Sequence, residues 1–98
     1  MRRNIKNVST VSPVQVGNAV LIRTVTHYYT GKIEVVSKHE LVLSSAAWIA
    51  DTGRFATALA TGKLNEVEPY PANAIVAINR AAIIDVSPWQ HALPTTQK

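Results

Sequence analysis

The sequence lacks cysteine and is poor in charged residues, and both absences limit what the chain can be. Without cysteine it forms no disulfide, no cysteine-based zinc site and no thiol nucleophile. Charged residues make up 16% of the chain, well under the roughly 25% usual in globular proteins, and hydrophobic residues make up 47%. A monomer of this composition would expose apolar surface, so we expect a homo-oligomer with apolar subunit faces. The alternative is a monomer rich in alanine, which is only weakly apolar.

Long apolar runs and catalytic motifs are also missing. No run reaches the roughly 18 residues that cross a bilayer, and the basic start is not followed by the hydrophobic stretch of a signal peptide. We therefore expect no membrane partner and a cytoplasmic location. The sequence has no G-x-S-x-G turn, P-loop or dinucleotide fingerprint, and His27, His39 and His91 lack metal-ligand spacing. These absences favour a protein that is not an enzyme and has no metal or cofactor.

The net charge of +4 is concentrated at the start of the chain, where Arg2, Arg3 and Lys6 lie close together. This basic segment is either a solvated terminus or an arm that binds a polyanion. The length of 98 residues predicts a single domain. We divide it into a basic, partly flexible arm at residues 1–16, a folded body at 17–87 with an insertion at 46–73, and a loose polar tail at 88–98.

Several segments rich in branched and aromatic residues predict β-strands. Residues 19–29 form the first predicted strand, with both faces partly apolar, so that one face covers the core and the other meets a neighbouring copy. Residues 31–36 and 40–45 form a hairpin around a turn at Ser37-Lys38-His39. Gly31 permits a bend or bulge at its start. A closing hairpin is predicted for residues 75–86, with its turn at Asn79-Arg80.

The middle of the chain changes character and predicts one short helix at about residues 52–61. Asp51 or Thr52 could cap its N-terminus, and Gly62 could end it. Residues 63–73 contain two prolines, which restrict this segment to a loop or an edge strand. Trp48 and Trp89 are expected to serve as packing anchors at the end of the fold or at a subunit contact.

The order of these features resembles the Sm-like fold group of Sm, Lsm and Hfq proteins. That group has an early hairpin containing a glycine, a variable insertion, and a short closing hairpin with a polar or basic turn. Ser37, Glu40 and Asn79-Arg80 stand where the family usually has Asp, Asn and Arg-Gly. The residues that match the family's apolar pattern and glycine are Gly31, Ile33, Val36, Leu41, Leu43, Ile78, Ile83 and Ile84.

The resemblance implies a mostly β, small SH3/Sm-like bent barrel of about five strands, assembled into a ring. It also implies RNA or a small nucleotide as a partner. A looser similarity to small uncharacterised phage and prophage proteins carries no activity, and it would place the protein in a host cytoplasm. The alternative function is a structural or adaptor oligomer, for example a component of a phage particle, with no ligand.

The two hairpin turns carry the best candidates for ligand binding. In an Sm-like barrel they come together on one face, where Lys38 and Arg80 would hold phosphate. His39, Asn79 and Tyr29 would contact the base. The alternative is that the turns are only soluble hairpin tips, and that the tyrosines next to His27 belong to the core and an interface.

Overall fold

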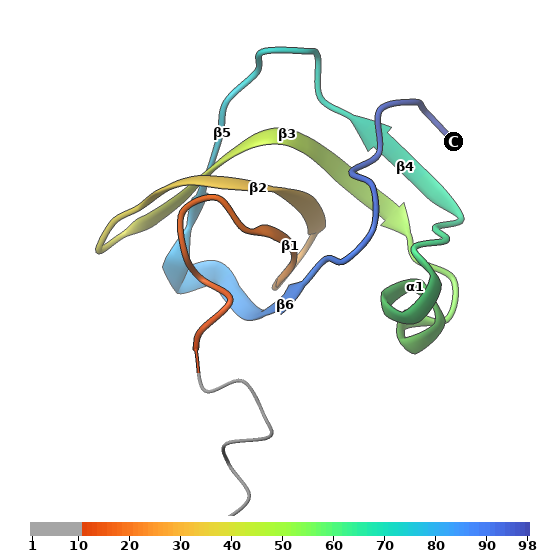
Figure 1. Ribbon diagram of the computed structural model, residues 1–98, viewed down its shortest axis with the longest axis horizontal. Helices are drawn as coiled ribbons and strands as arrows, with labels where there is room; N and C mark the ends of the chain where they lie inside the picture. Colours follow the sequence, from red (N-terminus) through yellow and green to blue (C-terminus); the bar gives the residue numbers. More distant parts are fainter. Residues whose placement is uncertain (1–10) are drawn as a thin grey trace, which may run out of the picture.

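The structure is a computed structural model that describes residues 11–98 as six β-strands and one short α-helix (Figure 1). The expected basic arm with Arg2, Arg3 and Lys6 falls largely on residues 1–10, outside the described residues. No helix within residues 11–98 is long and apolar enough to span a bilayer. The elements are β1 (Ala19–Thr24), β2 (Tyr28–Val36), β3 (Glu40–Asp51), α1 (Phe55–Thr61), β4 (Glu66–Pro69), β5 (Val76–Asn79), the 3-10 helix η2 (Arg80–Ala82) and β6 (Ile83–Pro88).

The strands form one bent antiparallel sheet in the order β4-β3-β2-β1-β6. β5 also pairs with β3, along residues 40–43, whereas β4 pairs with β3 along residues 47–51. η2 then carries the chain from β5 to β6, which pairs with β1 at the far end of the strand order. The sheet therefore curls into a small barrel (Figure 1). This confirms the mostly β, small bent barrel predicted from the sequence, with six strands in place of about five.

Gly31 produces the predicted bend in β2. The β2–β3 register shifts at this point, so that Gly31 alone faces two residues of β3, Ser45 and Ala46. Such a β-bulge increases the local twist and bends the strand. A Cβ atom on Gly31 would lie 3.0 Å from Leu43 Cδ1. Only glycine therefore lets β3 approach β2 this closely without displacing the Leu43 side chain.

β1 is buried on both faces, and the molecule consequently has two apolar clusters. Val20 and Ile22 point into the barrel, Leu21 between them points outward, and all three side chains are 0% exposed. The barrel interior consists of Val20, Ile22, Ile33, Leu41, Leu43, Ala46 and Ile78. The outer cluster consists of Leu21, Ala47, Ile49, Ala58, Leu64, Val67 and Trp89. The expectation that the second face meets a neighbouring copy is wrong for β1, because α1, β4 and the C-terminal segment cover it.

The single strand predicted for residues 19–29 is also wrong, because a turn at residues 25–27 divides it. The Thr24 hydroxyl holds this turn: it donates to the His27 carbonyl at 2.7 Å and accepts from the His27 backbone N–H at 2.9 Å. A threonine hydroxyl that bonds nearby backbone competes with the strand ladder. The composition of residues 19–29 favours a continuous strand, because strand propensity does not take account of the hydrogen bonds that the Thr24 hydroxyl makes.

The helix begins later than predicted. α1 starts at Phe55, with Arg54 as an N-cap that makes no side-chain hydrogen bond. The Asp51 carboxylate instead accepts the Gly53 backbone N–H at 2.8 Å, one turn earlier. Because β3 runs on to Asp51, the inserted segment also begins after residue 51 rather than at 46. Gly62 ends the helix in the left-handed conformation with φ 79°, as predicted.

Two predictions for the C-terminal third are corrected. β5 and β6 do not form a hairpin, since β5 pairs with β3 and β6 pairs with β1. The tail is not loose, because the backbone of Lys98 exchanges two hydrogen bonds with Val67 of β4, at 2.9 and 3.0 Å. Trp89 is the expected anchor: it is 3% exposed, and its indole N–H donates to the Ala92 carbonyl. β4 is an edge strand, in agreement with the proline content of its segment.

Thr30 provides a test of the packing around the outer cluster. Its side chain is fully buried opposite Leu21 and Ala47, and its hydroxyl has no hydrogen-bond partner. Thr30→Val keeps the shape and removes the unpaired hydroxyl, so we expect the free energy of unfolding to rise by about 1 kcal/mol. Urea denaturation measures this change. Thr96→Val, at an exposed position, is the matched control and should change stability by less than about 0.5 kcal/mol.

The ion pair between Arg23 of β1 and Asp85 of β6 predicts a pH dependence. The hydrogen bond from Arg23 lowers the pKa of Asp85, against an opposing effect of burial. A carboxyl whose pKa is lower in the folded state stabilises the fold above its unfolded pKa of about 4 and loses this effect as the pH falls. Wild type should therefore be more stable than Asp85→Asn at pH 7, and the urea midpoints should converge toward pH 2. A difference that persists unchanged at low pH would contradict this prediction.

Candidate ligand-binding surfaces

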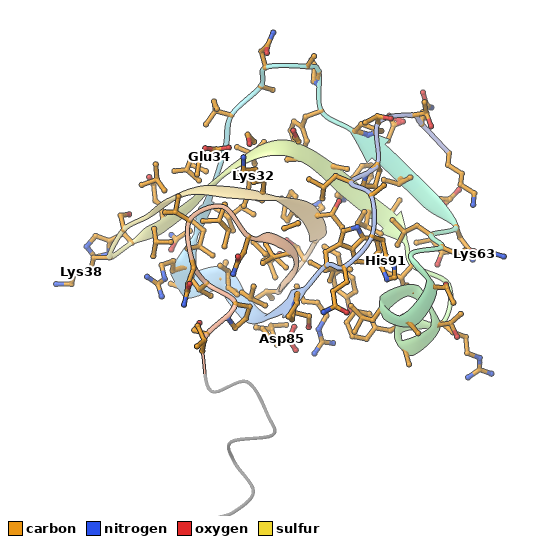
Figure 2. The ribbon with its side chains drawn as sticks, viewed as in Figure 1. Lys32, Glu34, Lys38, Lys63, Asp85 and His91 are labelled. Carbon is orange, nitrogen blue, oxygen red and sulfur yellow. The ribbon has the colours of Figure 1, made fainter. Side chains whose placement is uncertain are left out.

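The turn between β2 and β3 is closed by the side chain of its first residue. Ser37 Oγ donates to the Glu40 carbonyl at 3.2 Å and accepts from the Glu40 backbone N–H at 3.1 Å. The Ser37 backbone N–H also donates to the Glu40 carbonyl at 3.0 Å. These bonds fix the hairpin tip, where Lys38 and His39 are both exposed. Figure 2 shows Lys38 at this tip.

The second turn is held directly against the first. The Arg80 backbone N–H donates to the His39 carbonyl at 2.8 Å, and its guanidinium Nη1 donates to the Ser37 carbonyl at 2.8 Å. Asn79 Oδ1 accepts from the Ala81 backbone N–H at 2.9 Å and so caps η2. The structure therefore brings together four of the five residues that the sequence suggested for binding. We call Lys38, His39, Asn79 and Arg80 the turn surface.

The charges of the turn surface favour an anion, with one opposing group. Lys38 and Arg80 are exposed cations, and an arginine has five N–H donors, so one bond to Ser37 leaves others for a ligand. The Asn79 side-chain oxygen is occupied by its cap, which leaves the amide N–H₂ group to donate. Glu40 lies opposite Asn79 in the β3–β5 register and reduces the local positive potential.

Tyr29, the fifth predicted residue, lies away from the turn surface. It is the second residue of β2, and the turn follows the last, so most of a strand of 9 residues separates them. A strand of that length extends up to about 30 Å. The half-buried Tyr29 ring instead packs against the barrel interior and lines a pocket on another part of the sheet.

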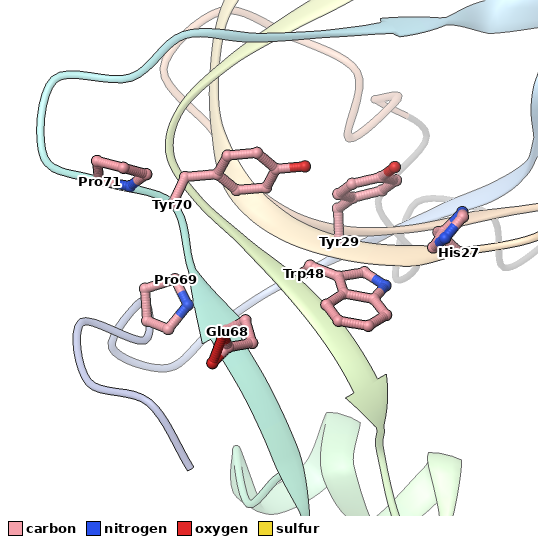
Figure 3. Close-up of a pocket in the computed structure, with 7 residues that line it drawn as sticks. All are labelled: His27, Tyr29, Trp48, Glu68, Pro69, Tyr70 and Pro71. Atoms are coloured by element: carbon pink, nitrogen blue, oxygen red, sulfur yellow. The ribbon is translucent and has the colours of Figure 1, made fainter.

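That pocket has a volume of about 400 Å³ and is lined mainly by aromatic rings (Figure 3). We call it the aromatic pocket. Pairing across three neighbouring strands places Tyr29 opposite Trp48, and Trp48 opposite Glu68. Just after β4, the Tyr70 backbone N–H donates to the Ala46 carbonyl at 2.9 Å, which holds the Tyr70 segment against β3. The lining residues are His27, Tyr29, Trp48, Glu68, Pro69, Tyr70 and Pro71.

Neighbouring rings of the aromatic pocket lie within the distance of ordinary aromatic contacts. The His27 ring centroid is 5.9 Å from that of Trp48 and 6.2 Å from that of Tyr29. Burial, and secondarily the neighbouring Tyr70 hydroxyl, raises the pKa of Tyr29 above its ordinary value. Trp48 and Tyr70 are each 38% exposed, so their rings remain accessible from solvent.

Only part of this pocket could be predicted from the sequence. The sequence predicts a base contact for Tyr29 and a packing role for Trp48. For residues 63–73, which include Glu68 and Tyr70, it predicts only a loop or an edge strand. Their association depends on the β2–β3 register, which shifts at the Gly31 bulge, and on the separate β3–β4 register. In residues 11–98, no three His, Asp or Glu side chains come together that could hold a metal ion.

Comparison with known proteins supports the fold. No protein-family model matches the chain, and no curated protein matches it. A solved structure of a heptameric archaeal Sm protein is similar, with a TM-score of 0.53 and 19% sequence identity. The match covers 74% of this chain and 87% of that one. The protein therefore has an Sm-like fold, in agreement with the resemblance seen in its sequence.

Proposed function

We propose that this protein is a non-catalytic, ring-forming homo-oligomer that binds an oligonucleotide or a nucleotide-like anion through its turn surface. The observation that carries the proposal is the pair of hydrogen bonds from Arg80 to the β2–β3 turn. They join two short polar turns, held by rigid strands, into one exposed surface with two cations. A site built in this way is preorganised, so little ordering is needed when a ligand binds.

Each residue of the turn surface has a distinct role in this proposal. Lys38 supplies a mobile positive charge, and Arg80 supplies N–H donors in a planar arrangement that matches phosphate oxygens. His39 follows Lys38 in the sequence, and Asn79 precedes Arg80. The His39 ring and the Asn79 amide would contact a base or sugar. Repetition around a ring would multiply the positive charges and raise the rate and strength of anion binding.

The open strand edges support assembly. β5 pairs on one side with β3, and β6 pairs on one side with β1, so each has an edge without a strand partner among residues 11–98. The exposed apolar side chains Ile75 and Ile84, at 63% and 59%, lie next to β5 and on β6. Pairing of β5 in one copy with β6 in the next would satisfy both edges. Such a head-to-tail contact closes into a ring when the rotation allows it.

A structural or adaptor oligomer without a ligand is the second candidate, and one observation favours it. Two side chains of the turn surface already serve the fold, since Asn79 caps η2 and Arg80 bonds the Ser37 carbonyl. In this case the turn surface would only stabilise the β2–β3 hairpin and η2, and the apolar edges would carry the function.

Binding can be tested by titrating fluorescently labelled single-stranded RNA, single-stranded DNA and mononucleotides across a range of salt concentrations. Lys38→Glu should weaken binding of every sequence by about tenfold and reduce the salt dependence, because it removes a phosphate contact. Arg80→Glu should act in the same direction, but it also removes the bond to Ser37, so Lys38→Glu is the cleaner variant.

Lys63→Glu is the matched control, because Lys63 is an exposed lysine on the side of the molecule away from Lys38 (Figure 2). It should bind as the wild type does. The binding proposal fails if the wild type binds none of these ligands at low salt, or if Lys63→Glu weakens binding as much as Lys38→Glu. Normal assembly together with absent binding would favour the adaptor.

Assembly can be tested by native mass spectrometry of the wild type and of Ile84→Glu. A buried, unpaired carboxylate at the β6 edge should shift the protein from a ring to monomers, because removing that charge from water is costly. Val16→Glu changes an apolar side chain of similar exposure, 64%, that is not part of β5 or β6, and it should leave the subunit number unchanged. A wild type that is monomeric at micromolar concentration would overturn the ring.

A further inference from the structure

The aromatic pocket is a second candidate site, separate from the turn surface and not used by the proposed function. Three side chains from adjacent strands, Tyr29, Trp48 and Glu68, form one row across the sheet. Tyr70 follows β4 and lines the same pocket as Tyr29 and Trp48 (Figure 3). The volume of the aromatic pocket, about 400 Å³, lies within the range of about 300–1,000 Å³ that is usual for small-ligand sites.

Two of the large aromatic rings of the pocket are partly exposed to solvent. The neighbours of Trp48 along β3, Ala47 and Ile49, are 0% and 4% exposed, whereas Trp48 is 38% exposed. Tyr70 is exposed to the same degree. Two large rings kept accessible on either side of one hollow provide apolar surface that a ligand could cover.

The aromatic rings and the carboxylate that line the pocket favour a positively charged ligand. The face of an aromatic ring is electrically negative and attracts a cation, most strongly for tryptophan. Glu68, which also lines the pocket, carries a full negative charge, and no lysine or arginine of residues 11–98 lines it. A phosphate would be repelled by Glu68 and would find no cationic partner. An organic cation would instead meet negative ring faces and a carboxylate.

We propose that the aromatic pocket binds an organic cation of the alkylated ammonium type. Such a group has an apolar surface that packs against Tyr29, Trp48 and Tyr70, and a spread positive charge that Glu68 compensates. The group could belong to a free small molecule or to a methylated lysine side chain of another protein. Both sources present the same chemistry to the pocket, and titration with one probe of each kind distinguishes them.

The test uses the two tryptophans as internal reporters in two-dimensional ¹H–¹⁵N NMR spectra of the full chain. The indole N–H of Trp48 should shift when choline or a peptide containing trimethyllysine is added. The indole of Trp89 is buried and bonded to the Ala92 carbonyl, so it should not shift. A stronger response to choline assigns a small-molecule ligand, and a stronger response to the peptide assigns a protein side chain.

A neutral ligand of the same shape isolates the contribution of charge. 3,3-Dimethylbutan-1-ol replaces the nitrogen of choline by carbon and should bind roughly tenfold more weakly. Glu68→Gln should weaken choline binding severalfold, whereas Glu66→Gln, on the same strand but outside the pocket, should leave it unchanged. Tyr70→Leu, which alters an exposed residue outside the strands, should also weaken binding without unfolding the protein.

Three results would overturn the proposal. The first is no shift of the Trp48 indole with either cation at tens of millimolar. The second is equal affinity for choline and its neutral analogue, which would show that charge plays no part. The third is a shift of Trp48 with a nucleoside monophosphate but not with choline, which would assign the pocket to nucleotide binding.

Discussion

Burial of β1 on both faces is the constraint on which the rest of the structure depends. A strand that is apolar on both sides must be covered twice, and a sheet of this size covers it only once. The bend at Gly31 brings β3, β5 and β6 around Val20 and Ile22. α1, β4 and the segment from Trp89 to Lys98 then close over Leu21. The inserted segment and the C-terminal segment are therefore parts of the core, and removing either would expose the centre of the sheet.

The sequence predicts those features that depend on short-range signals. The turn at Ser37–His39, the bend at Gly31 and the end of α1 at Gly62 each follow from the conformational preferences of a few neighbouring residues. The partners of β5 and β6 could not be predicted in this way, because alternating apolar residues show that a strand exists but not which strand it joins. The division of the first predicted strand depends on one hydroxyl, that of Thr24, and the order of the tail depends on contacts with Val67, far away in the sequence.

The turn surface and the aromatic pocket also differ in how far they could be predicted from the sequence. The turn surface could be inferred because both turns occur at the ends of strands that a small barrel brings together, and Arg80 then joins them. The aromatic pocket could not be inferred, since the row of Tyr29, Trp48 and Glu68 exists only in one register of three strands. A shift of one residue would point Trp48 to the opposite face of the sheet. If both proposals hold, the two surfaces lie apart and differ in charge preference, and one subunit would hold two different ligands.

The backbone bonds between Lys98 and Val67 have a consequence for how copies can meet. They occupy the outer side of β4, which would otherwise offer unpaired peptide groups to any passing strand. With that side blocked, the strand edges that remain unpaired among residues 11–98 are those of β5 and β6. In the proposed assembly, further copies would then be added only through the edges of β5 and β6. The proposed ring fits this arrangement, because pairing of β5 in one copy with β6 in the next leaves no further edge for branching among residues 11–98.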